Sequence, residues 1–474
     1  MITKGEKYSY GDLQIIPAKI TSINSRSECN CEYDVDGQKM LPLFTAPMDS
    51  VADDTNYMKF KENGIIPIIH RNVSFETRYK LMLEGEWCAF DTNEFREVFC
   101  NDTEYTSLYN RESNLSGLKV KALIDVASGH MAHLFELSNT SKNLAKKHYV
   151  ELTLMSGNVA NPDTWFEYCK NGIDYMRTSI GTGSMCLTTA NSAVGYPIAS
   201  LIDEIRTIKQ EYATQQCMFD YDEKRDGLLC YAGKIRQKYP NFTETKIIAD
   251  GGCRNYSDII IALALGADYV MCGGMFAAFL ESCAHLNPSS QTNPDKEGYL
   301  IRIDAKNAFT EETKFFFSIP NKMKSSAIDD YVELAHKYNL DVPFGGNNTT
   351  SYIYPSPTTT IIIPYSVLFR NEDVARWVVK HISLEKSSHG MSTKEAQIGK
   401  ILSRGEKVDY NKLKTSEGKT ITSQVEYTIG QWTENFRHYL KNTMSYCDAR
   451  SLDEFIGEVE LIVKSRGTKE SVNK

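Results

Sequence analysis

The sequence predicts an α/β protein built as a (β/α)8 TIM barrel, with two insertions and a helical C-terminal tail. Two observations predict this fold. Eight short apolar runs alternate with segments of helical spacing over about 230 residues, as eight strand–helix repeats require. Polar and glycine-rich segments follow directly after these runs, and the end of the strands is where enzymes with such barrels keep their active sites.

The apolar runs are the expected strands of the barrel. They cover residues 43–48, 65–69, 87–90, 120–127, 150–155, 175–180, 246–249 and 269–272. Between most of them the apolar residues recur with helical spacing, in segments 53–62, 131–146, 163–170, 198–208 and 257–265. This alternation favours parallel strands connected by helices.

Seven polar segments follow the strands and would share the carboxyl-terminal rim of the barrel. They are residues 47–50, 70–72, 125–129, 156–158, 181–184, 250–252 and 273–275. The last two hold glycine pairs after strands seven and eight, where barrels commonly bind a phosphate. Their backbone N–H groups and a following helix N-terminus would attract an anion. One glycine pair alone is also typical of a tight turn, but seven such segments in register favour a site.

Composition narrows the class of protein. The 474 residues are 24% charged and 41% hydrophobic, which is ordinary for a globular chain large enough for one big core or several domains. The net charge of −8 argues against a general nucleic-acid surface. Neither a secretory signal nor an apolar run of about 20 residues is present, so we expect no membrane contact and a cytoplasmic location. The 12 scattered cysteines are then expected to be reduced.

The predicted organisation has four parts: an irregular lead-in at 1–40, the barrel core at 41–283, an inserted subdomain or lid at 284–385, and nucleotide-binding loops with the C-terminal tail at 386–474. A smaller, charged and tyrosine-rich excursion spans 209–242. The large insertion has a strand-like run at 358–365 and a helix-like run at 373–382. A surface insertion with no role at the rim is an equal alternative for it, although loops this long are usually functional or disordered.

The segment from 174 to 197 is the centre of the functional prediction. A strand ends in the loop Gly181-Thr182-Gly183-Ser184, and Cys186 and Thr188 come next along the chain. Glycines separated by one residue let the backbone turn its N–H groups toward an anion. A cysteine on such a loop is placed to attack a substrate that carries a phosphate. From these residues alone, an ordinary turn with a buried cysteine remains the alternative.

Together these motifs resemble the IMP dehydrogenase / GMP reductase family, over roughly residues 10–283 and 388–463. The cysteine loop with Val194-Gly195-Tyr196-Pro197 is the most specific match. The segments at 250–253 and 266–275 resemble the family's phosphate-binding strands, and those at 390–392 and 417–419 resemble its later nucleotide-binding loops. The resemblance thus covers most of the chain apart from the two insertions.

Within the family, several segments look more like GMP reductase, including 125–130, 195–197 and 416–420. The regulatory CBS pair that IMP dehydrogenases usually carry between strands two and three is missing, and the dehydrogenase's Arg-Tyr flap is not recognisable. Residues 45–50, by contrast, look more like the dehydrogenase. From the resemblance we therefore expect NADPH-dependent reductive deamination of GMP to IMP. An IMP dehydrogenase without CBS domains, an enzyme for a modified purine nucleotide, and a non-catalytic nucleotide-binding scaffold are the alternatives.

The same resemblance assigns residues to roles. Cys186 would attack purine C2, and Thr188 and Glu417 would move protons to the departing amine. The substrate-binding residues would be Ser184, Asp250, Gly251, Gly252, Gly273, Gly274, Gly390, Met391, Ser392 and Gly418, with Asp250 on the ribose hydroxyls. The residues that bind NADPH would be Ser25, Arg26, Arg71, Asp125, Val126, Ala127, Ile180 and Gly181, helped by the tail around 442–445. Arginines suit a 2′-phosphate, although a surface ion pair is the alternative for each.

The resemblance also implies a potassium ion, which would be held by backbone carbonyls of Gly181, Gly183 and Cys186. Thr189 stands where the family has an arginine, Leu187 where threonine is usual, and Lys414 where an arginine would meet the nucleotide. These departures bear on the cation and on the stiffness of the loop. Family members are usually tetramers, so a homotetramer is expected.

Overall fold

The computed structural model describes residues 5–183, 188–226, 238–287, 296, 298–304, 312–320, 326–340, 358–390, 393–394, 397–398, 401, 407–410, 413 and 418–464. The chain divides into two compact units. The barrel unit comprises Met1–Gly273, Gly390–Lys419 and Phe436–Lys474. The second unit comprises Gly274–His389 and Thr420–Asn435. Among the described residues, no helix has the length and apolar character needed to cross a membrane.

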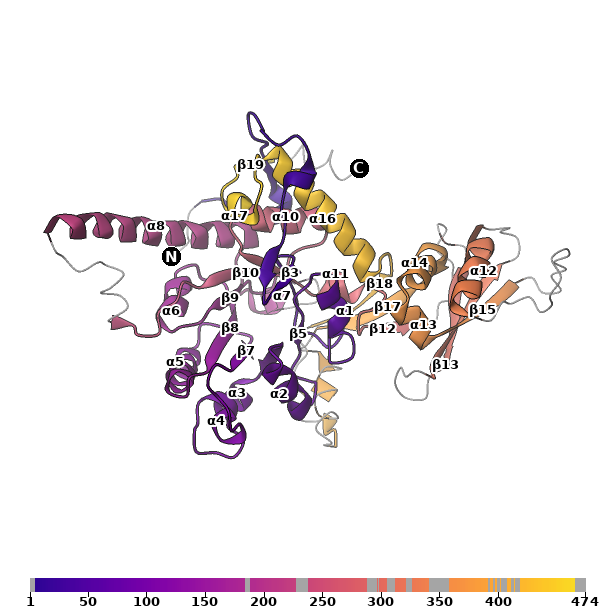
Figure 1. Ribbon diagram of the computed structural model, residues 1–474, viewed down its shortest axis with the longest axis horizontal. Coiled ribbons are helices and arrows are strands. Elements are labelled where there is room, and N and C mark those ends of the chain that lie inside the picture. The colour runs from indigo at the N-terminus through magenta and orange to yellow at the C-terminus, as the bar shows by residue number, and fades with distance from the viewer. Residues whose placement is uncertain are drawn as a thin grey trace. The chain divides into compact units, whose positions relative to one another are not determined.

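Eight parallel strands form the sheet of the barrel unit (Figure 1). They are β4 (Leu43–Thr45), β5 (Ile68–Ile69), β6 (Trp87–Phe90), β7 (Lys119–Asp125), β8 (Glu151–Val159), β9 (Tyr175–Thr178), β10 (Lys246–Asp250) and β11 (Tyr269–Cys272). Their order is β4-β11-β10-β9-β8-β7-β6-β5. The two outer strands meet where Phe44 bridges Ile66 in parallel, with Ile66 N donating to Leu43 O at 2.9 Å. The sheet therefore closes on itself, and the predicted (β/α)8 barrel is confirmed.

Helices follow the strands, in segments that the apolar spacing largely predicted. They are α1 (Tyr57–Glu62), α2 (Phe75–Leu83), α3 (Thr92–Phe99), α4 (Leu108–Arg111), α5 (Ala132–Lys147), α6 (Thr164–Lys170), α7 (Thr188–Ser192), α8 (Ile198–Asp226) and α10 (Tyr256–Ala264). Side-chain caps set several starts: Asp91 accepts from the backbone of Glu94, and Asn255 accepts from that of Asp258. The helix predicted at 198–208 continues to Asp226, so the excursion at 209–242 begins as helix; α8 is the long helix in Figure 1.

The amino end of the barrel is filled by aromatic side chains. Phe44 lies 6.0 Å from the Trp87 ring and 5.1 Å from the Tyr269 ring, and Tyr175 lies 5.4 Å from Trp87. A hairpin formed by β2 (Tyr33–Val35) and β3 (Gln38–Met40) adds Tyr33, 5.4 Å from Tyr269. Because large side chains fill this end of the barrel, we expect ligands to bind at the opposite rim.

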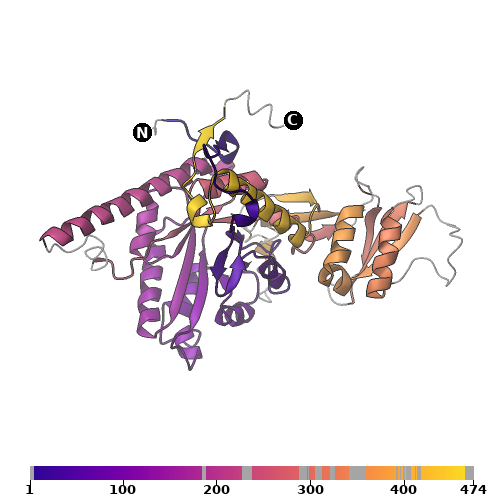
Figure 2. The same cartoon turned by 45° about the horizontal axis from the view of Figure 1, so that its top comes forward.

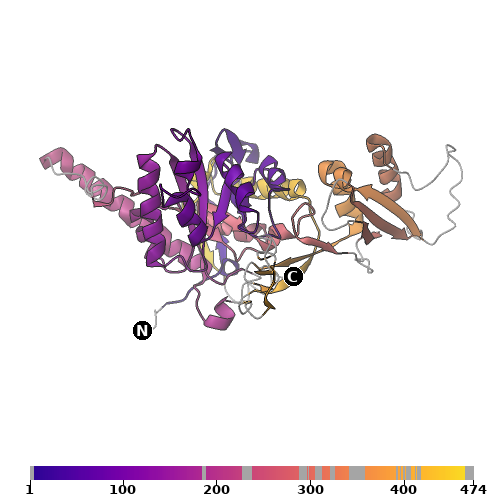
Figure 3. The same ribbon diagram turned by 90° about the horizontal axis from the view of Figure 1, so that it is seen from below.

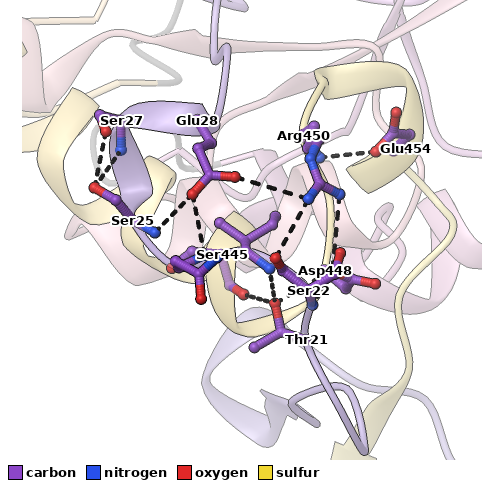
Figure 4. Close-up of polar contacts among 11 residues, drawn as sticks. Thr21, Ser22, Ser25, Ser27, Glu28, Ser445, Asp448, Arg450 and Glu454 are labelled. Atoms are coloured by element: carbon purple, nitrogen blue, oxygen red, sulfur yellow. Dashed lines mark hydrogen bonds and ion pairs between the residues drawn. The ribbon is translucent and has the colours of Figure 1, made fainter.

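Segments far apart in the sequence hold each other at the edge of the barrel unit. Strand β1 (Leu13–Ile15) pairs antiparallel with β19 (Leu461–Val463). Figure 4 shows Asp448 accepting from Ser22 N and Oγ, both at 2.8 Å, and Thr21 Oγ1 donating to Ser445 O at 2.8 Å. The short helices η1 (Tyr10–Asp12), η2 (Arg26–Glu28) and α17 (Leu452–Phe455) complete these segments, with the long helix α16 (Ile429–Tyr446) from Phe436 on. The lead-in predicted as irregular thus contains paired strands.

The second unit has its own hydrophobic core. It contains α11 (Gly274–Ala277), β12 (His285–Asn287), β13 (Gly298–Asp304), β14 (Lys314–Pro320), α12 (Ser326–Tyr338), β15 (Thr358–Pro364), α13 (Tyr365–Arg370), α14 (Glu372–His381), β16 (Ile382–Ser383), β17 (Glu385–His389) and β18 (Thr420–Gln424). One sheet has the order β15-β14-β13-β16 and a smaller one the order β12-β17-β18.

In β14 and β15 the buried apolar residues alternate along the strand, so they share one face of the larger sheet, and helices cover that face. Phe315, Phe317, Ile361 and Ile363 are fully buried, and Figures 2 and 3 show α12 and α14 packed over the strands. Trp377 Nε1 on α14 donates to Ala327 O on α12 at 2.9 Å. The predicted strand at 358–365 and helix at 373–382 are found as β15 and α14.

Candidate active site

Four polar side chains converge at the carboxyl ends of neighbouring barrel strands. Arg177 on β9 bridges Asp125 at the end of β7 and Asp250 at the end of β10. Its Nη1 lies 2.8 Å from Asp125 Oδ1, and its Nε lies 3.0 Å from Asp250 Oδ2. Asn158 Nδ2 on β8 donates to the same Asp250 oxygen at 2.7 Å. The barrel thus joins the aspartate predicted for the cofactor to the one predicted for the ribose.

Arg177 keeps its charge although it is buried. The side chain is 8% exposed, and its partners Asp125 and Asp250 are 13% and 12% exposed. Burial by itself lowers the pKa of Arg177, but the nearby carboxylates of Asp250 and Asp125 outweigh it and raise that pKa. Removing one partner would leave an uncompensated charge, so the three groups act as a unit.

A second polar group stands at the end of β5. Arg71 Nε lies 3.6 Å from Asp125 Oδ2, and this nitrogen is buried without a hydrogen-bond partner among the described residues. Next to it His70 is buried, and burial lowers the pKa of its imidazole, so the ring is neutral at pH 7. His70 Nδ1 accepts from Asn72 N at 3.2 Å. Arg71 Nε is therefore a buried hydrogen-bond donor that could bind an acceptor atom of a ligand.

The loop after β9 is shaped by close backbone approaches. Gly181 has φ +74°, and a Cβ at this position would lie 1.7 Å from Thr189 Oγ1. Thr189 Oγ1 in turn donates to Val194 O at 2.8 Å. Only glycine fits here, and Thr189 helps to close the loop.

This loop also touches the turn after β10. A Cβ built on Gly251, which has φ +94°, would lie 3.1 Å from Thr182 Oγ1 and 3.3 Å from Gly183 N. Gly252, with φ +80°, faces Tyr10, whose Cε2 would be 3.3 Å from an added Cβ. A cavity of about 780 Å³ opens here and is lined in part by Tyr10, Thr182 and Gly252. Two glycine-rich loops that were predicted to bind the substrate are therefore side by side.

Several predicted site residues lie outside the described part of the chain: Ser184, Cys186, Leu187, Met391, Ser392, Lys414 and Glu417. Thr188 begins α7, and its side chain is not described. The roles assigned to these residues, and the potassium site that would use Cys186, stay predictions. Of the remaining glycines, Gly273 follows β11 and lies close to Met48. Gly390 and Gly418 belong to the barrel unit, and Gly274 begins the second unit.

The residues predicted for the cofactor fall into two groups. Asp125 is the last residue of β7. Arg71, Val126, Ala127, Ile180 and Gly181 follow β5, β7 and β9. Ser25 and Arg26 belong to the N-terminal segment, where Ser25 caps η2 and Arg26 Nη1 lies 3.1 Å from His438 Nε2 on α16. Within the first group the structure pairs Arg71 with Asp125. Ser25 bonds within its own short segment, and Arg26 contacts His438.

The family profile described as the IMP dehydrogenase / GMP reductase domain matches residues 7–221 and 233–295, more than half of the chain. The chain belongs to this family. It is therefore an oxidoreductase of a family that uses a nicotinamide cofactor in purine nucleotide metabolism. The match includes all eight barrel strands and ends early in the second unit.

Individual relatives agree with the profile. A GMP reductase of Bacillus subtilis (strain 168) is 29% identical over 277 residues, which are 58% of this chain and 72% of the relative. GMP reductase 1 of Homo sapiens is 26% identical over 290 residues, 59% of this chain and 71% of the relative. An inosine-5′-monophosphate dehydrogenase of Borreliella burgdorferi is 25% identical over 326 residues, 59% and 72% of the two chains. This family member is thus similar to enzymes with both activities.

Neither Arg177 nor the contact between Asn158 and Asp250 was predicted from the sequence. The signal that could have found Arg177 is the alternation of side chains along the strand. Arg177 stands two residues after Tyr175, whose ring faces the barrel interior. Side chains two apart on a strand share a face, so a charged residue at this position points into the barrel.

Proposed function

We propose that the protein is a GMP reductase, which converts GMP to IMP and ammonia with NADPH through a covalent cysteine thioimidate at purine C2. The observation that carries the proposal is the contact between the loop after β9 and the turn after β10, where Gly183 N faces Gly251. The segment leading to Cys186 therefore starts beside Asp250, the carboxylate expected to hold the ribose.

The rim residues fit a nicotinamide cofactor. Arg71 Nε is a buried donor without a hydrogen-bond partner among the described residues, and the largely buried Asp125 next to it is held by Arg177. These side chains would hold a cofactor's ribose and phosphate groups by charge-assisted hydrogen bonds. When bound, NADPH would supply the hydride that reaches purine C2.

Asp250 is prepared for the nucleotide by its neighbours. Its Oδ2 accepts from Arg177 Nε and Nη2 and from Asn158 Nδ2, at 2.7–3.0 Å. The carboxylate is thereby fixed in orientation, with Oδ1 left to accept from ribose hydroxyls. Backbone N–H groups of Ser184, Gly252, Gly273 and Gly274 would bind the phosphate.

The chemistry would follow from three side chains. Cys186 attacks C2 of the purine, and the 2-amino group leaves as ammonia. Thr188 and Glu417 deliver the proton that makes the amine a good leaving group. After C2 has been reduced, the carbon–sulfur bond breaks, and IMP leaves with the cysteine regenerated. Splitting the substitution into two steps lowers each barrier.

A single assay tests this function. Purified protein is incubated with GMP and NADPH while the absorbance of the reduced cofactor is followed, with Cys186→Ala as a parallel sample. We expect NADPH oxidation with release of IMP and ammonia, and loss of both in the variant. Reduction of NAD⁺ with IMP and no turnover of GMP would instead make the protein an IMP dehydrogenase.

The reductase is favoured over the dehydrogenase by the connection between β5 and β6. Only the loop at 70–74, helix α2 and the loop at 84–86 lie there, where CBS modules would be inserted. A modified purine nucleotide is the proposed substrate if neither GMP nor IMP turns over but a nucleotide still binds.

We also propose a cytoplasmic homotetramer with a potassium ion on the cysteine loop. Mass measurement in solution would test the homotetramer, and activity with sodium in place of potassium would test the cation.

A further inference from the structure

The tyrosine of the motif Val194-Gly195-Tyr196-Pro197 has no part in the proposed chemistry, yet it stands where the cysteine loop joins helix α8. Its hydroxyl donates to both carboxylate oxygens of Glu204 on α8, at 2.7 Å to Oε2 and 2.9 Å to Oε1. Burial raises the pKa of Tyr196, so the hydroxyl keeps its proton at neutral pH and acts as a donor. The end of the loop is therefore fastened to α8 by a side chain as well as by the backbone.

Helix α8 is a firm support for this contact. It packs on β9 and β10, and on its first turns Ile198 is 2% exposed while Leu201 and Ile205 are fully buried. Leu201 N donates to Pro197 O at 3.0 Å, so helical hydrogen bonding begins directly after Tyr196. Glu204 thus holds Tyr196 against an element that is packed on the barrel rather than on the loop.

The N-terminal segment holds Glu204 as well. Lys7 Nζ forms an ion pair with the Glu204 carboxylate and lies 5.4 Å from the centre of the Tyr196 ring. Ser200 Oγ accepts from Tyr8 N at 2.8 Å, and Ser200 N donates to Tyr8 O at 3.2 Å. Because Ser200 and Glu204 are one turn apart on the same face of α8, two successive residues of the N-terminal segment contact the helix there.

The two sides of the loop's stem, which we define as Ile180 and residues 194–196, are also joined to each other. Thr189 Oγ1 lies 2.8 Å from Val194 O and 3.3 Å from Ile180 O, so one hydroxyl bridges the stem. A Cβ built on Gly195 would lie 2.7 Å from Thr189 Oγ1 and 3.2 Å from Ile180 O. Because the stem is this tightly packed, a displacement of Tyr196 would reach Ile180 on its other side.

We propose that Tyr196 and Glu204, supported by Lys7, are positioning residues that hold the stem of the cysteine loop in the arrangement needed for attack on purine C2. The inference rests on the proposed function, because it takes Cys186 as the nucleophile. The three side chains act through the backbone of the stem and need no contact with the substrate. A misplacement of about 1 Å far from the chemistry can lower a rate about a hundredfold.

These contacts should matter more for turnover than for stability. The side chains of Lys7 and Glu204 are 27% and 33% exposed, and ion pairs with this much exposure contribute little to the free energy of unfolding. Tyr79 on α2 offers a matched control, since its hydroxyl donates to Glu112 Oε1 at 3.0 Å and α2 holds no residue of the proposed site. Tyr196→Phe and Tyr79→Phe each remove one hydroxyl that donates to a glutamate.

The first test measures steady-state kinetics of the full chain with GMP and NADPH. In Tyr196→Phe, kcat should fall about tenfold, because the loop is held less firmly. The dissociation constant of GMP, measured by calorimetry without cofactor, should change less than about threefold, because Asp250 and the turn glycines are untouched. Tyr79→Phe should keep the wild-type kcat. An equal loss in both variants, or a loss of GMP affinity as large as the loss of kcat, would overturn the positioning role.

Substitutions of Glu204 separate the hydrogen bond from the ion pair. Glu204→Gln keeps an acceptor for the Tyr196 hydroxyl and loses the ion pair with Lys7, so it should retain most of the wild-type kcat. Glu204→Ala removes both contacts and should match Tyr196→Phe. If Glu204→Gln and Glu204→Ala lost kcat equally, an acceptor for Tyr196 would not be what positions the loop.

A second readout needs no turnover. The rate at which iodoacetamide alkylates Cys186 is followed by mass spectrometry of the peptide that contains it. Alkylation should be about threefold faster in Tyr196→Phe and Glu204→Ala, because a less firmly held loop exposes its thiol for more of the time, and unchanged in Tyr79→Phe. Wild-type rates in all variants would overturn the inference. If the wild type does not turn over GMP, the proposed function fails, while the alkylation rates still decide whether Tyr196 and Glu204 hold the loop.

Discussion

The two units of this protein both bury charged side chains, and they do so in different ways. In the barrel unit, Arg177 lies between two carboxylates at 2.8–3.0 Å. In the second unit, Lys386 Nζ donates to Ser282 O at 2.6 Å and to Ser282 Oγ at 3.0 Å, and Glu281 Oε2 accepts from Ile429 N at 3.0 Å. The barrel pairs opposite charges directly, whereas the second unit mainly uses neutral hydrogen-bonding groups.

The difference decides which groups stay charged at neutral pH. Burial lowers the pKa of Lys386 to about 8. Burial, and then the nearby Glu372, raises the pKa of Glu281 to about 7. The pKa of Arg177 moves the other way because its partners outweigh desolvation. Direct pairing thus keeps the charges of the rim fixed, while the second unit titrates close to physiological pH.

The largest effect is expected from breaking the paired charges. Arg177→Met leaves Asp125 and Asp250 buried without their shared cation, and it should lower the free energy of unfolding by about 3–5 kcal/mol. Urea unfolding of the full chain measures this loss. Arg177→Lys, which keeps the charge but not the planar fork, should lose less. If Arg177→Met unfolded at the same urea concentration as the wild type, the ion pairs of Arg177 would contribute no stability.

Glu281→Gln should remove the titration in the second unit. The pKa of Glu281 in the folded protein, about 7, is above its ordinary value of 4.5, so its contribution is complete below pH 4.5 and is lost as the pH rises through 7. Glutamine keeps an acceptor for Ile429 N and has no charge to bury. At pH 8.5 the variant should therefore be roughly 3 kcal/mol more stable than wild type, with no difference at pH 4.

Urea unfolding at these two pH values measures the difference. Glu333→Gln, on the exposed side of α12, is the matched control and should change stability equally little at both values. A Glu281→Gln variant with the pH dependence of wild type would show that Glu281 is not the group that titrates.

Gly181→Ala tests the close approaches on the rim. The substitution requires a left-handed residue with a Cβ 1.7 Å from Thr189 Oγ1, which should cost about 1–3 kcal/mol and reduce turnover. Gly11→Ala is the control, because a Cβ there meets nothing within 4 Å. Thermal unfolding and steady-state kinetics are measured on both. Equal behaviour of the two variants would show that the loop has space to spare.

The smallest effect is expected at a neutral polar group. Tyr10→Phe removes a buried hydroxyl without a partner among the described residues, and it should stabilise the protein by about 1 kcal/mol. Tyr168→Phe removes a hydroxyl that donates to Gly129 O at 3.1 Å, and it should destabilise by a similar amount. Thermal unfolding compares the two. A loss of stability in Tyr10→Phe would mean that its hydroxyl has an acceptor in the free protein.

Short-range patterns in the sequence predicted the barrel well. Each strand is a compact apolar run, and each rim segment comes at the end of its strand, so the order of elements could be read directly. The fold class predicted that the sheet closes, but nothing in the sequence identified Phe44 and Ile66 as the residues that bridge its two outer strands. The pairing of β1 with β19 could not be predicted, because it joins two short segments with no pattern that specifies the partner.

The site was predicted by its glycine loops and missed at its charged centre. Asp125 and Asp250 stand at the ends of strands, where polar residues were interpreted as site residues, whereas Arg177 lies inside a run that was interpreted as an apolar strand. Its role depends on which strands are neighbours: β9 lies between β8 and β10, a property of the closed sheet. The pKa values of Glu281 and Lys386 depend equally on burial and on neighbours that sequence alone does not reveal.

The pairing of the first strand with the last also sets an order of events during synthesis. Thr21 bonds to Ser445, 424 positions later, and β1 pairs with β19 farther along still. The ribosome synthesises β1 long before β19, so β1 stays unpaired while the barrel strands are synthesised and assemble. Contacts between such distant residues form slowly. Joining of the two ends is therefore expected to be the last step of folding.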